Sequence, residues 1–310
     1  MHRDRSSTSN GQTPGIYRPL RFSGTLELDT FPAGGPDLVH GRGRATQVRS
    51  PAGRLVLCLP LSTSLQLQSA DGEWDLAPGM LQLWRDGELR VRSVDAGDWL
   101  LLSCALAPPR AKQQETRWNL LPQRAPCPRA LRRLLVRLAR ASRDPRLGEP
   151  RLLLASCLAE AEAWQARALA LPLSRCRGRT PTRRHQTLLR LMRVRMLVEN
   201  HPGERLDMAR LAHSANYSPW HLIRLYRDVF GETPSEYAQR LRMARAWTLV
   251  RETRRPICEI TEALGFESQS SFCRAFRQAY GRTTSDVRRL RDASTAVSGL
   301  HQQPRGSRAA

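Results

Sequence analysis

The stretch MARLAHSANYSPWHLIRLYRDVFGETPSEY (residues 208–237) is followed by a second stretch of the same design, ICEITEALGFESQSSFCRAFRQAYGRTTSDV (residues 257–287). From Ser218 onward the two copies align at a constant offset of fifty, which pairs Ser218 with Ser268. Upstream the offset is forty-nine, so the one-residue slip falls in a turn. A repeat of this kind indicates one supersecondary unit used twice, and each copy has the pattern of a helix-turn-helix.

The first copy starts with a short helix whose small residues Ala209 and Ala212 allow a second helix to cross closely. Asn216 lies in the turn and tolerates a left-handed backbone. Ser218 fits a helix N-cap, with Pro219 at the first helical position. Helical spacing predicts that Leu222, Ile223, Leu225 and Tyr226 face inward, and that Trp220, His221, Arg224 and Arg227 face outward.

The second copy repeats this design, with Gly265 at the turn, Phe266 in the core and Ser268 as the N-cap. Its predicted inward residues are Ile257, Ile260, Ala263, Leu264, Phe272, Ala275 and Phe276. Its predicted outward residues are Gln269, Ser270, Ser271, Arg274 and Arg277. These side chains suit a DNA groove, because Arg bonds guanine edges or phosphate, Gln prefers adenine and Ser adapts to either.

A long helix is predicted between the two copies. Residues 233–236 (TPSE) form a capping box that opens it. About eighteen helical residues span roughly 27 Å, so the two reading helices are expected to enter successive major-groove segments about 34 Å apart on one face of double-stranded DNA.

Alternative interpretations stay open at this level. Trp220 could belong to the core, and Arg227 and Arg277 could serve only in ion pairs with scaffold acids such as Asp228 or Glu232. The histidines His201 and His213 are interpreted as surface or turn residues rather than metal ligands.

Residues 206–290 resemble the C-terminal domain of the AraC/XylS family of bacterial transcription regulators, above all in GFESQSSFCRAFRQAYG (residues 265–281). The resemblance implies two helix-turn-helix units bridged by a long helix, and activation by contact with RNA polymerase. It also implies that seven side chains contact DNA bases or phosphates, namely Trp220, His221, Arg224, Gln269, Ser270, Ser271 and Arg274. The full set of DNA-binding candidates is Ser218, Trp220, His221, Arg224, Arg227, Gln269, Ser270, Ser271, Arg274 and Arg277.

Two positions depart from the family pattern. Thr261 stands where the family usually has Ala, at a close helix contact, and Thr284 replaces the usual Pro after Gly281. Residues 283–286 still offer a capping box, so neither change is expected to prevent the fold.

Residues 20–108 are predicted to be β-structure, with short apolar runs separated by Asp-Gly and Pro-Gly turns. The runs cover residues 55–61, 65–68, 80–84, 89–94 and 99–106. This spacing favours a small sandwich or barrel, and the architecture is similar to the cupin-like sensory domains of the family, with PGMLQLW (residues 78–84) resembling their Pro-Gly strand turn.

Helical periodicity begins at Pro128, with one helix through Leu131, Leu134, Leu135 and Leu138 and a second over about residues 151–170. The two helices are expected to pack on the β domain or to form a dimer seam. The predicted layout is a disordered start (1–19), an all-β cupin-like domain with trailing helices (20–171), a linker (172–184), an all-α DNA-binding domain with a lead-in helix (185–290) and a disordered tail (291–310).

The chain of 310 residues has a net charge of +22, and the charge is unevenly distributed. Residues 1–109 carry 11 basic and 11 acidic side chains, whereas residues 110–184 carry 18 and 5, a difference of 13. Because 49 of the 50 basic residues are Arg, part of this charge reflects a GC-rich genome. A neutral first third joined to a basic remainder suits a sensing domain attached to a polyanion-binding one.

Few features point to other chemistry. The seven cysteines include no CxxC pair and are interpreted as small buried hydrophobes. His40 is the only histidine between Arg3 and Arg184, which argues against a metal-dependent cupin enzyme. With no phosphate loop or GxSxG motif, we expect no catalysis and no cofactor. Without an apolar run of membrane-span length or a secretory signal, a cytoplasmic protein with no membrane partner is expected.

The sequence thus predicts a sequence-specific DNA-binding transcription regulator, dimeric, whose N-terminal domain senses a small effector or mediates assembly. Two alternatives remain. One is an architectural protein that binds nucleic acid through arginine charge without sequence preference. The other is a ligand-binding or enzymatic cupin that carries a DNA-binding module.

Overall fold

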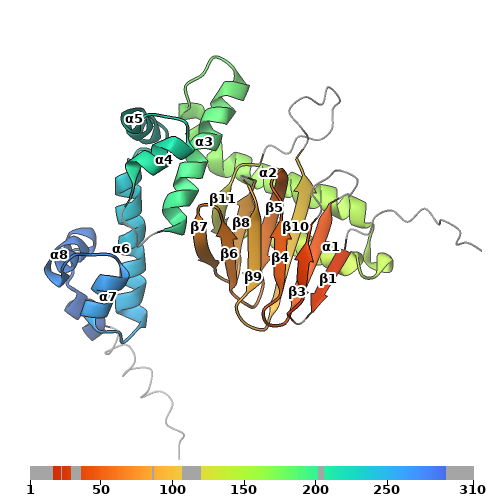
Figure 1. Cartoon of the computed structure of the whole chain (residues 1–310), viewed down its shortest axis with the longest axis horizontal. Coiled ribbons are helices and arrows are strands. Elements are labelled where there is room, and N and C mark those ends of the chain that lie inside the picture. Colours follow the sequence, from red (N-terminus) through yellow and green to blue (C-terminus); the bar gives the residue numbers. More distant parts are fainter. Residues whose placement is uncertain are drawn as a thin grey trace, which may run out of the picture. The chain divides into compact units, whose positions relative to one another are not determined.

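The computed structural model describes residues 17–21, 23–28, 36–85, 87–106, 120–201 and 206–290. The described residues form two compact units. The N-terminal unit holds those up to Asn200 together with Ser214–Asn216, and the C-terminal unit holds the rest. Strands are confined to the first of these units, and Figure 1 labels the elements of both.

Two β-sheets form the centre of the N-terminal unit. The six-stranded sheet has the order β1 (Tyr17–Arg21), β3 (Asp37–Arg42), β10 (Asp98–Ala105), β5 (Arg54–Pro60), β8 (Met80–Trp84) and β11 (Gln123–Pro126). The five-stranded sheet has the order β2 (Thr25–Glu27), β4 (Gln47–Ser50), β9 (Leu89–Ser93), β6 (Leu65–Ser69) and β7 (Gly72–Leu76). Neighbouring strands pair antiparallel except β1 with β3 and β2 with β4, which are parallel.

The apolar pattern of each strand follows from what covers its two faces. Strand β5 is buried on both, because Leu57 belongs to the core on one side of its sheet and Val56 to the core between the sheets. Strand β9 alternates buried Leu89 and Val91 with exposed arginines, because only one of its faces is covered. These two patterns are the ones expected of a covered sheet and of a half-solvated one.

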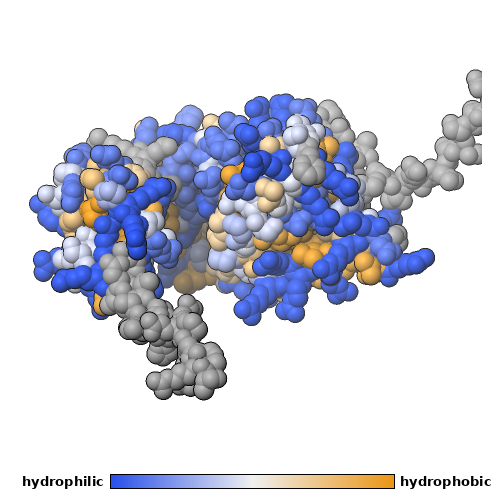
Figure 2. Space-filling view, turned by 90° about the horizontal axis from the view of Figure 1, so that it is seen from below, coloured by the Kyte–Doolittle hydropathy of each residue, from blue (hydrophilic) through white to orange (hydrophobic). Residues whose placement is uncertain are grey.

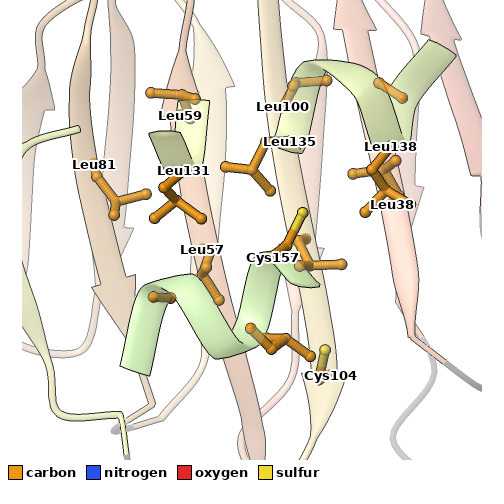
Figure 3. Packing of buried hydrophobic residues seen from close by; sticks show 14 of the residues in the cluster. Leu38, Leu57, Leu59, Leu81, Leu100, Cys104, Leu131, Leu135, Leu138 and Cys157 are labelled. Carbon is orange, nitrogen blue, oxygen red and sulfur yellow. The ribbon is translucent and has the colours of Figure 1, made fainter. Parts of the chain in front are cut away.

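Two helices cover the outer face of the six-stranded sheet. Leu131, Leu135 and Leu138 of α1 (Arg129–Ala141) and Cys157 of α2 (Pro150–Arg175) pack with strand leucines in one buried cluster. Figure 3 shows these residues meeting Leu57, Leu59 and Leu100. The predicted helices after Pro128 are therefore confirmed as elements that pack on the β-structure.

The connection expected to be a linker, residues 172–184, is largely helical. Helix α2 runs to Arg175 although it contains Pro172, and α3 (Pro181–Asn200) begins four residues before the expected start at His185. The hydroxyl of Thr180 accepts a hydrogen bond from the backbone N–H of Arg183 at 3.3 Å. This Thr180–Pro181 pair is a helix-start signal, and the linker prediction overlooked it.

Helix α3, expected as the lead-in helix of the DNA-binding domain, falls within the N-terminal unit. Met196 belongs to the core between the sheets, and its sulfur accepts a hydrogen bond from the side-chain amide of Gln82 at 3.2 Å. The boundary between the units therefore lies later than the predicted residue 185, because the apolar face of α3 is used by the β-structure.

The C-terminal unit is helical. Its labelled helices are α4 (Met208–Ser214), α5 (Pro219–Phe230), α6 (Pro234–Glu252), α7 (Ile257–Ala263) and α8 (Gln269–Tyr280). A further helical segment covers residues 284–290. Figure 1 shows α6 as a long helix, with α4 and α5 near one of its ends and α7 and α8 near the other.

Some sequence expectations on the β-structure need correction. The expected disordered start, residues 1–19, overlaps β1, which begins at Tyr17; the earlier residues and the predicted tail lie outside the described residues. Strands β1, β2, β3, β4, β7 and β11 were not among the predicted runs, since they are short and rich in polar residues, and β11 lies beyond the predicted β-region of residues 20–108. The sandwich itself is confirmed, whereas the cupin likeness stays a prediction.

The surface of the chain is largely hydrophilic on the face shown in Figure 2, with smaller hydrophobic areas between. Exposed large apolar side chains include Leu152 and Trp220, each with 69% of its surface accessible. Among the described residues, no helix has both the length and the apolar character that crossing a bilayer requires.

Candidate nucleic-acid interface

The first helix-turn-helix motif consists of α4 and α5, and its turn has the backbone that the sequence predicted. Asn216 adopts a φ of 54°, in the left-handed region. The Ser218 hydroxyl accepts a hydrogen bond from the backbone N–H of His221 at 3.4 Å, and Pro219 occupies the first turn of α5. Gly231 ends the helix with a φ of 82°. Local chemistry therefore sets both ends of α5.

The second motif, α7 and α8, repeats this geometry. Gly265 takes a φ of 68° at the turn, and the Ser268 hydroxyl accepts from the backbone N–H of Ser271 at 3.2 Å. Gly281 ends α8 with a φ of 67°. The predicted caps and turns of both motifs are confirmed, which places α5 and α8 in equivalent positions within their motifs.

Each of these two helices is anchored by large buried side chains. Tyr226 of α5 and both Phe272 and Phe276 of α8 are fully buried. The ring of Phe276 lies 6.1 Å from that of Trp247 on α6, in a stacked arrangement. Because the buried residues recur at helical spacing, the opposite face of each helix is held toward solvent.

Helix α6 joins the motifs and begins with the predicted capping box. The Thr233 hydroxyl accepts from the backbone N–H of Glu236 at 3.2 Å, and the Glu236 carboxylate accepts from the backbone N–H of Thr233 at 2.6 Å. The carboxylate also accepts from the Thr233 hydroxyl at 2.9 Å. The two bonds that it accepts lower the pKa of Glu236, most strongly the one from the Thr233 backbone. The 19 residues of α6 correspond to about 28 Å of rigid helix.

The outward side chains of α5 are exposed as predicted. Trp220 is exposed rather than in the core, and the guanidinium of Arg224 lies 5.6 Å from its ring centroid. The ring of His221 lies 5.0 Å from that of Tyr217. Arg227 is exposed but donates to Glu236 at 3.0 Å, the ion-pair alternative left open by the sequence.

On α8 the predicted side chains divide into two groups. Gln269, Ser270, Arg274 and Arg277 are exposed. Ser271 is half-buried, and its hydroxyl donates to the backbone carbonyl of Ser268 at 2.7 Å. Ser271 therefore supports the helix start, and its hydroxyl proton is engaged in the free chain.

The prediction that a side chain faces inward was wrong at three positions. Ile223, Ala209 and Ala263 are exposed, because the buried stripe of each helix is narrower than the apolar run in the sequence. Ile223 is thus an apolar member of the α5 outer face that sequence reasoning missed.

Thr261, the polar residue where the family usually has Ala, is buried and donates its hydroxyl proton to the Ile257 carbonyl at 2.7 Å, which satisfies the polar group at this helix contact.

The described residues contain no group of three or more His, Cys, Asp or Glu side chains placed to hold a metal ion. The arrangement of α5 and α8 instead presents guanidinium, amide, hydroxyl and aromatic groups on two helices.

Comparison with known proteins places this part of the chain. The family described as "Helix-turn-helix domain" matches residues 211–290. The regulatory protein SoxS of Salmonella typhimurium is 37% identical over 91 residues, which are 29% of this chain and 85% of SoxS. The right origin-binding protein of Escherichia coli is 35% identical over 92 residues, which are 30% of this chain and 32% of that protein.

Among solved structures, the chain is similar to a transcriptional regulator with an AraC-type DNA-binding domain from Chromobacterium violaceum. The sequence identity is 30%, the match covers 34% of this chain and 94% of that chain, and the TM-score is 0.32. The repeated motif, its confirmed caps and the extensive match to SoxS agree with the resemblance read from residues 265–281. The chain belongs to the AraC/XylS family of transcription regulators.

Proposed function

We propose that this protein binds a specific promoter or operator sequence through α5 and α8, which read adjacent major-groove segments of one duplex. The observation that carries the proposal is the exposure of two matched sets of polar side chains on equivalent helices. Trp220, His221 and Arg224 form the first set, and Gln269, Ser270, Arg274 and Arg277 form the second.

The length of α6 supports this use of the two helices. Its span of about 28 Å is close to the pitch of B-form DNA, about 34 Å. Arginine and glutamine side chains are the groups that pair bidentately with guanine and adenine edges, and the exposed Ile223 suits the methyl group of thymine.

Regulation is proposed to start in the N-terminal unit. This unit senses a small effector or holds two copies of the chain together. Effector binding or assembly then alters how the DNA-binding helices are presented to DNA. Activation through contact with RNA polymerase is proposed from family membership. The N-terminal unit has its own core of two packed sheets and two covering helices, which supports a separate role.

The decisive measurement is competition binding of the full chain to genomic fragments, followed by selection of a preferred site. A specific regulator should hold that site about a thousandfold more tightly than random duplex. Equal affinity for all fragments would instead support an architectural protein driven by the charge of +22.

Two substitutions test the residues. Arg274→Ala and Gln269→Ala should each weaken binding to the preferred site by about 1 to 3 kcal/mol. Gln278→Ala is the matched control, because this exposed amide lies on α8 about half a turn round from Gln269. If Gln269→Ala behaves like the control and Arg274→Ala binds normally, the contacts are misassigned.

A further inference from the structure

Helix α1 of the N-terminal unit carries a face of arginines that neither the fold nor the two motifs requires. Between residues 129 and 147 the chain has seven arginines and one acidic residue, Asp144. Arg129, Arg132, Arg133, Arg137 and Arg140 of α1 are all exposed.

The arginines lie opposite the buried face of the helix. Leu131, Leu135 and Leu138 face the six-stranded sheet, whereas Arg129, Arg133 and Arg140 follow the spacing i, i+4 and i+11 along the opposite side. Sheet packing therefore holds α1 in one rotational setting, and that setting presents the arginines together to solvent.

Within the part of the chain that the structure describes, no carboxylate forms an ion pair with the five arginines of α1; Arg133 donates only to the Arg129 carbonyl of its own helix, at 3.4 Å. By contrast, Arg49 and Arg90 on the outer face of the five-stranded sheet both bond to Glu88. Repulsion among like charges makes the unpaired cluster a site that gains from an external polyanion.

We infer that the arginine face of α1 binds the phosphate backbone of DNA next to the site read by α5 and α8, an inference that rests on the proposed function. From Arg129 to Arg140 the face is about 16 Å long, and one strand of duplex places a charge every 3.4 Å or so along its axis, or about five phosphates over this length. Guanidinium groups bind phosphate oxygens bidentately. The contact adds affinity without sequence preference.

The test compares two variants with the same change in net charge. One variant replaces Arg129, Arg133, Arg137 and Arg140 with Gln. The matched control replaces Arg44, Arg49, Arg90 and Arg92 with Gln, which are exposed arginines of the same unit outside α1. Binding of the full chain is measured against salt concentration on a duplex of the preferred site with about two helical turns of flank on each side.

The α1 variant should lose affinity by about tenfold or more, and its salt dependence should flatten by about 0.9 in log–log slope for each lost phosphate contact. The sheet-face control should keep the slope to within about one contact. Replacing the four α1 arginines with Lys retains the charge and should restore most of the slope. Thermal unfolding of all variants checks that these exposed positions leave the fold intact.

Equal slopes for the α1 variant and the wild-type chain would overturn the inference. The inference would also be overturned if the α1 variant kept its affinity for DNA but lost binding to an acidic protein. The slopes are also measured on a random duplex of the same length, so the outcome does not depend on site preference. A chain without a preferred site refutes the proposed function, whereas a chain that holds its site with unchanged slopes refutes only the role of α1.

Discussion

The two helix-turn-helix motifs share one scaffold but leave different side chains available. The offset of fifty equates Arg227 with Arg277 and Glu236 with Asp286. Glu236 reaches back to Arg227 at 3.0 Å, whereas Asp286, one methylene shorter, pairs with Arg289. Among the described residues, no carboxylate pairs with Arg277. The motifs differ here in the length of the capping carboxylate and in its neighbour, because Arg289 stands where the first motif has Gln239.

The motifs also differ in how their helices are anchored. Both contain an aromatic pair, Tyr226 with Phe230 in the first and Phe276 with Tyr280 in the second. The second motif adds Phe272, which contacts Phe276, where the first has Leu222. Both solutions bury the same face of the helix. The comparison shows that the scaffold tolerates different packing while the outer face carries the difference in recognition.

The largest expected effect concerns the core of the second motif. Phe272→Ala should destabilise it by about 3 to 5 kcal/mol, because a fully buried ring leaves a cavity. Amide hydrogen exchange should show lost protection in α7 and α8 and smaller changes in α4 and α5. Ser270→Ala, an exposed control on the same helix, should leave exchange unchanged. Equal loss in both motifs would mean that they unfold as one element.

The next effect concerns the free and the engaged arginine. Arg277→Ala should weaken site binding by about 1 to 3 kcal/mol, whereas Arg227→Ala should cost less, because its guanidinium must first leave Glu236. Asp286→Glu should give Arg277 a partner and reproduce part of the loss. Fluorescence anisotropy with the selected duplex measures all three, and a greater loss for Arg227→Ala would reverse the comparison.

The helix caps should give a smaller effect that depends on pH. Thr233→Ala and Thr283→Ala each remove a cap worth about 1 kcal/mol. Bonds to Thr233 and Thr283 lower the pKa of Glu236 and Asp286 in the folded chain. Their stabilisation is therefore complete above the unfolded values of about 4.3 and 3.9 and is lost as the pH falls through the folded values. Urea unfolding at several pH values should show a shallower acid loss for both Thr variants; an unchanged profile would contradict the role of the caps.

The smallest effect concerns Trp220, which has Ser270 as its counterpart in the second motif. Trp220→Ala removes the ring that faces Arg224 and should weaken site binding by about 0.5 to 1 kcal/mol. Stability should not fall, since the side chain is exposed. A large loss of stability with normal DNA binding would identify Trp220 as a structural residue instead.

The extent of successful prediction differs between the two halves of the chain. The caps and turns of α5 and α8 depend on neighbouring residues, so Ser218, Asn216 and Ser268 were sufficient to locate them. Strand β3 depends on a distant contact instead. A Cβ at Gly41 would lie 2.0 Å from the ring of Trp99 on β10, so the close pairing of the two strands requires glycine here. This polar segment becomes a strand only when β10 packs beside it.

Sequence alone determined where the helices of the two motifs begin and end, because caps, turns and helical periodicity act over a few residues. Tertiary structure alone decided which of those side chains are free. It exposed Ile223, engaged Arg227 and Ser271, assigned α3 to the β-structure and turned the arginines of α1 to solvent. The reason is physical: burial and ion pairing depend on atoms contributed by other elements, whose positions are set only when the chain packs.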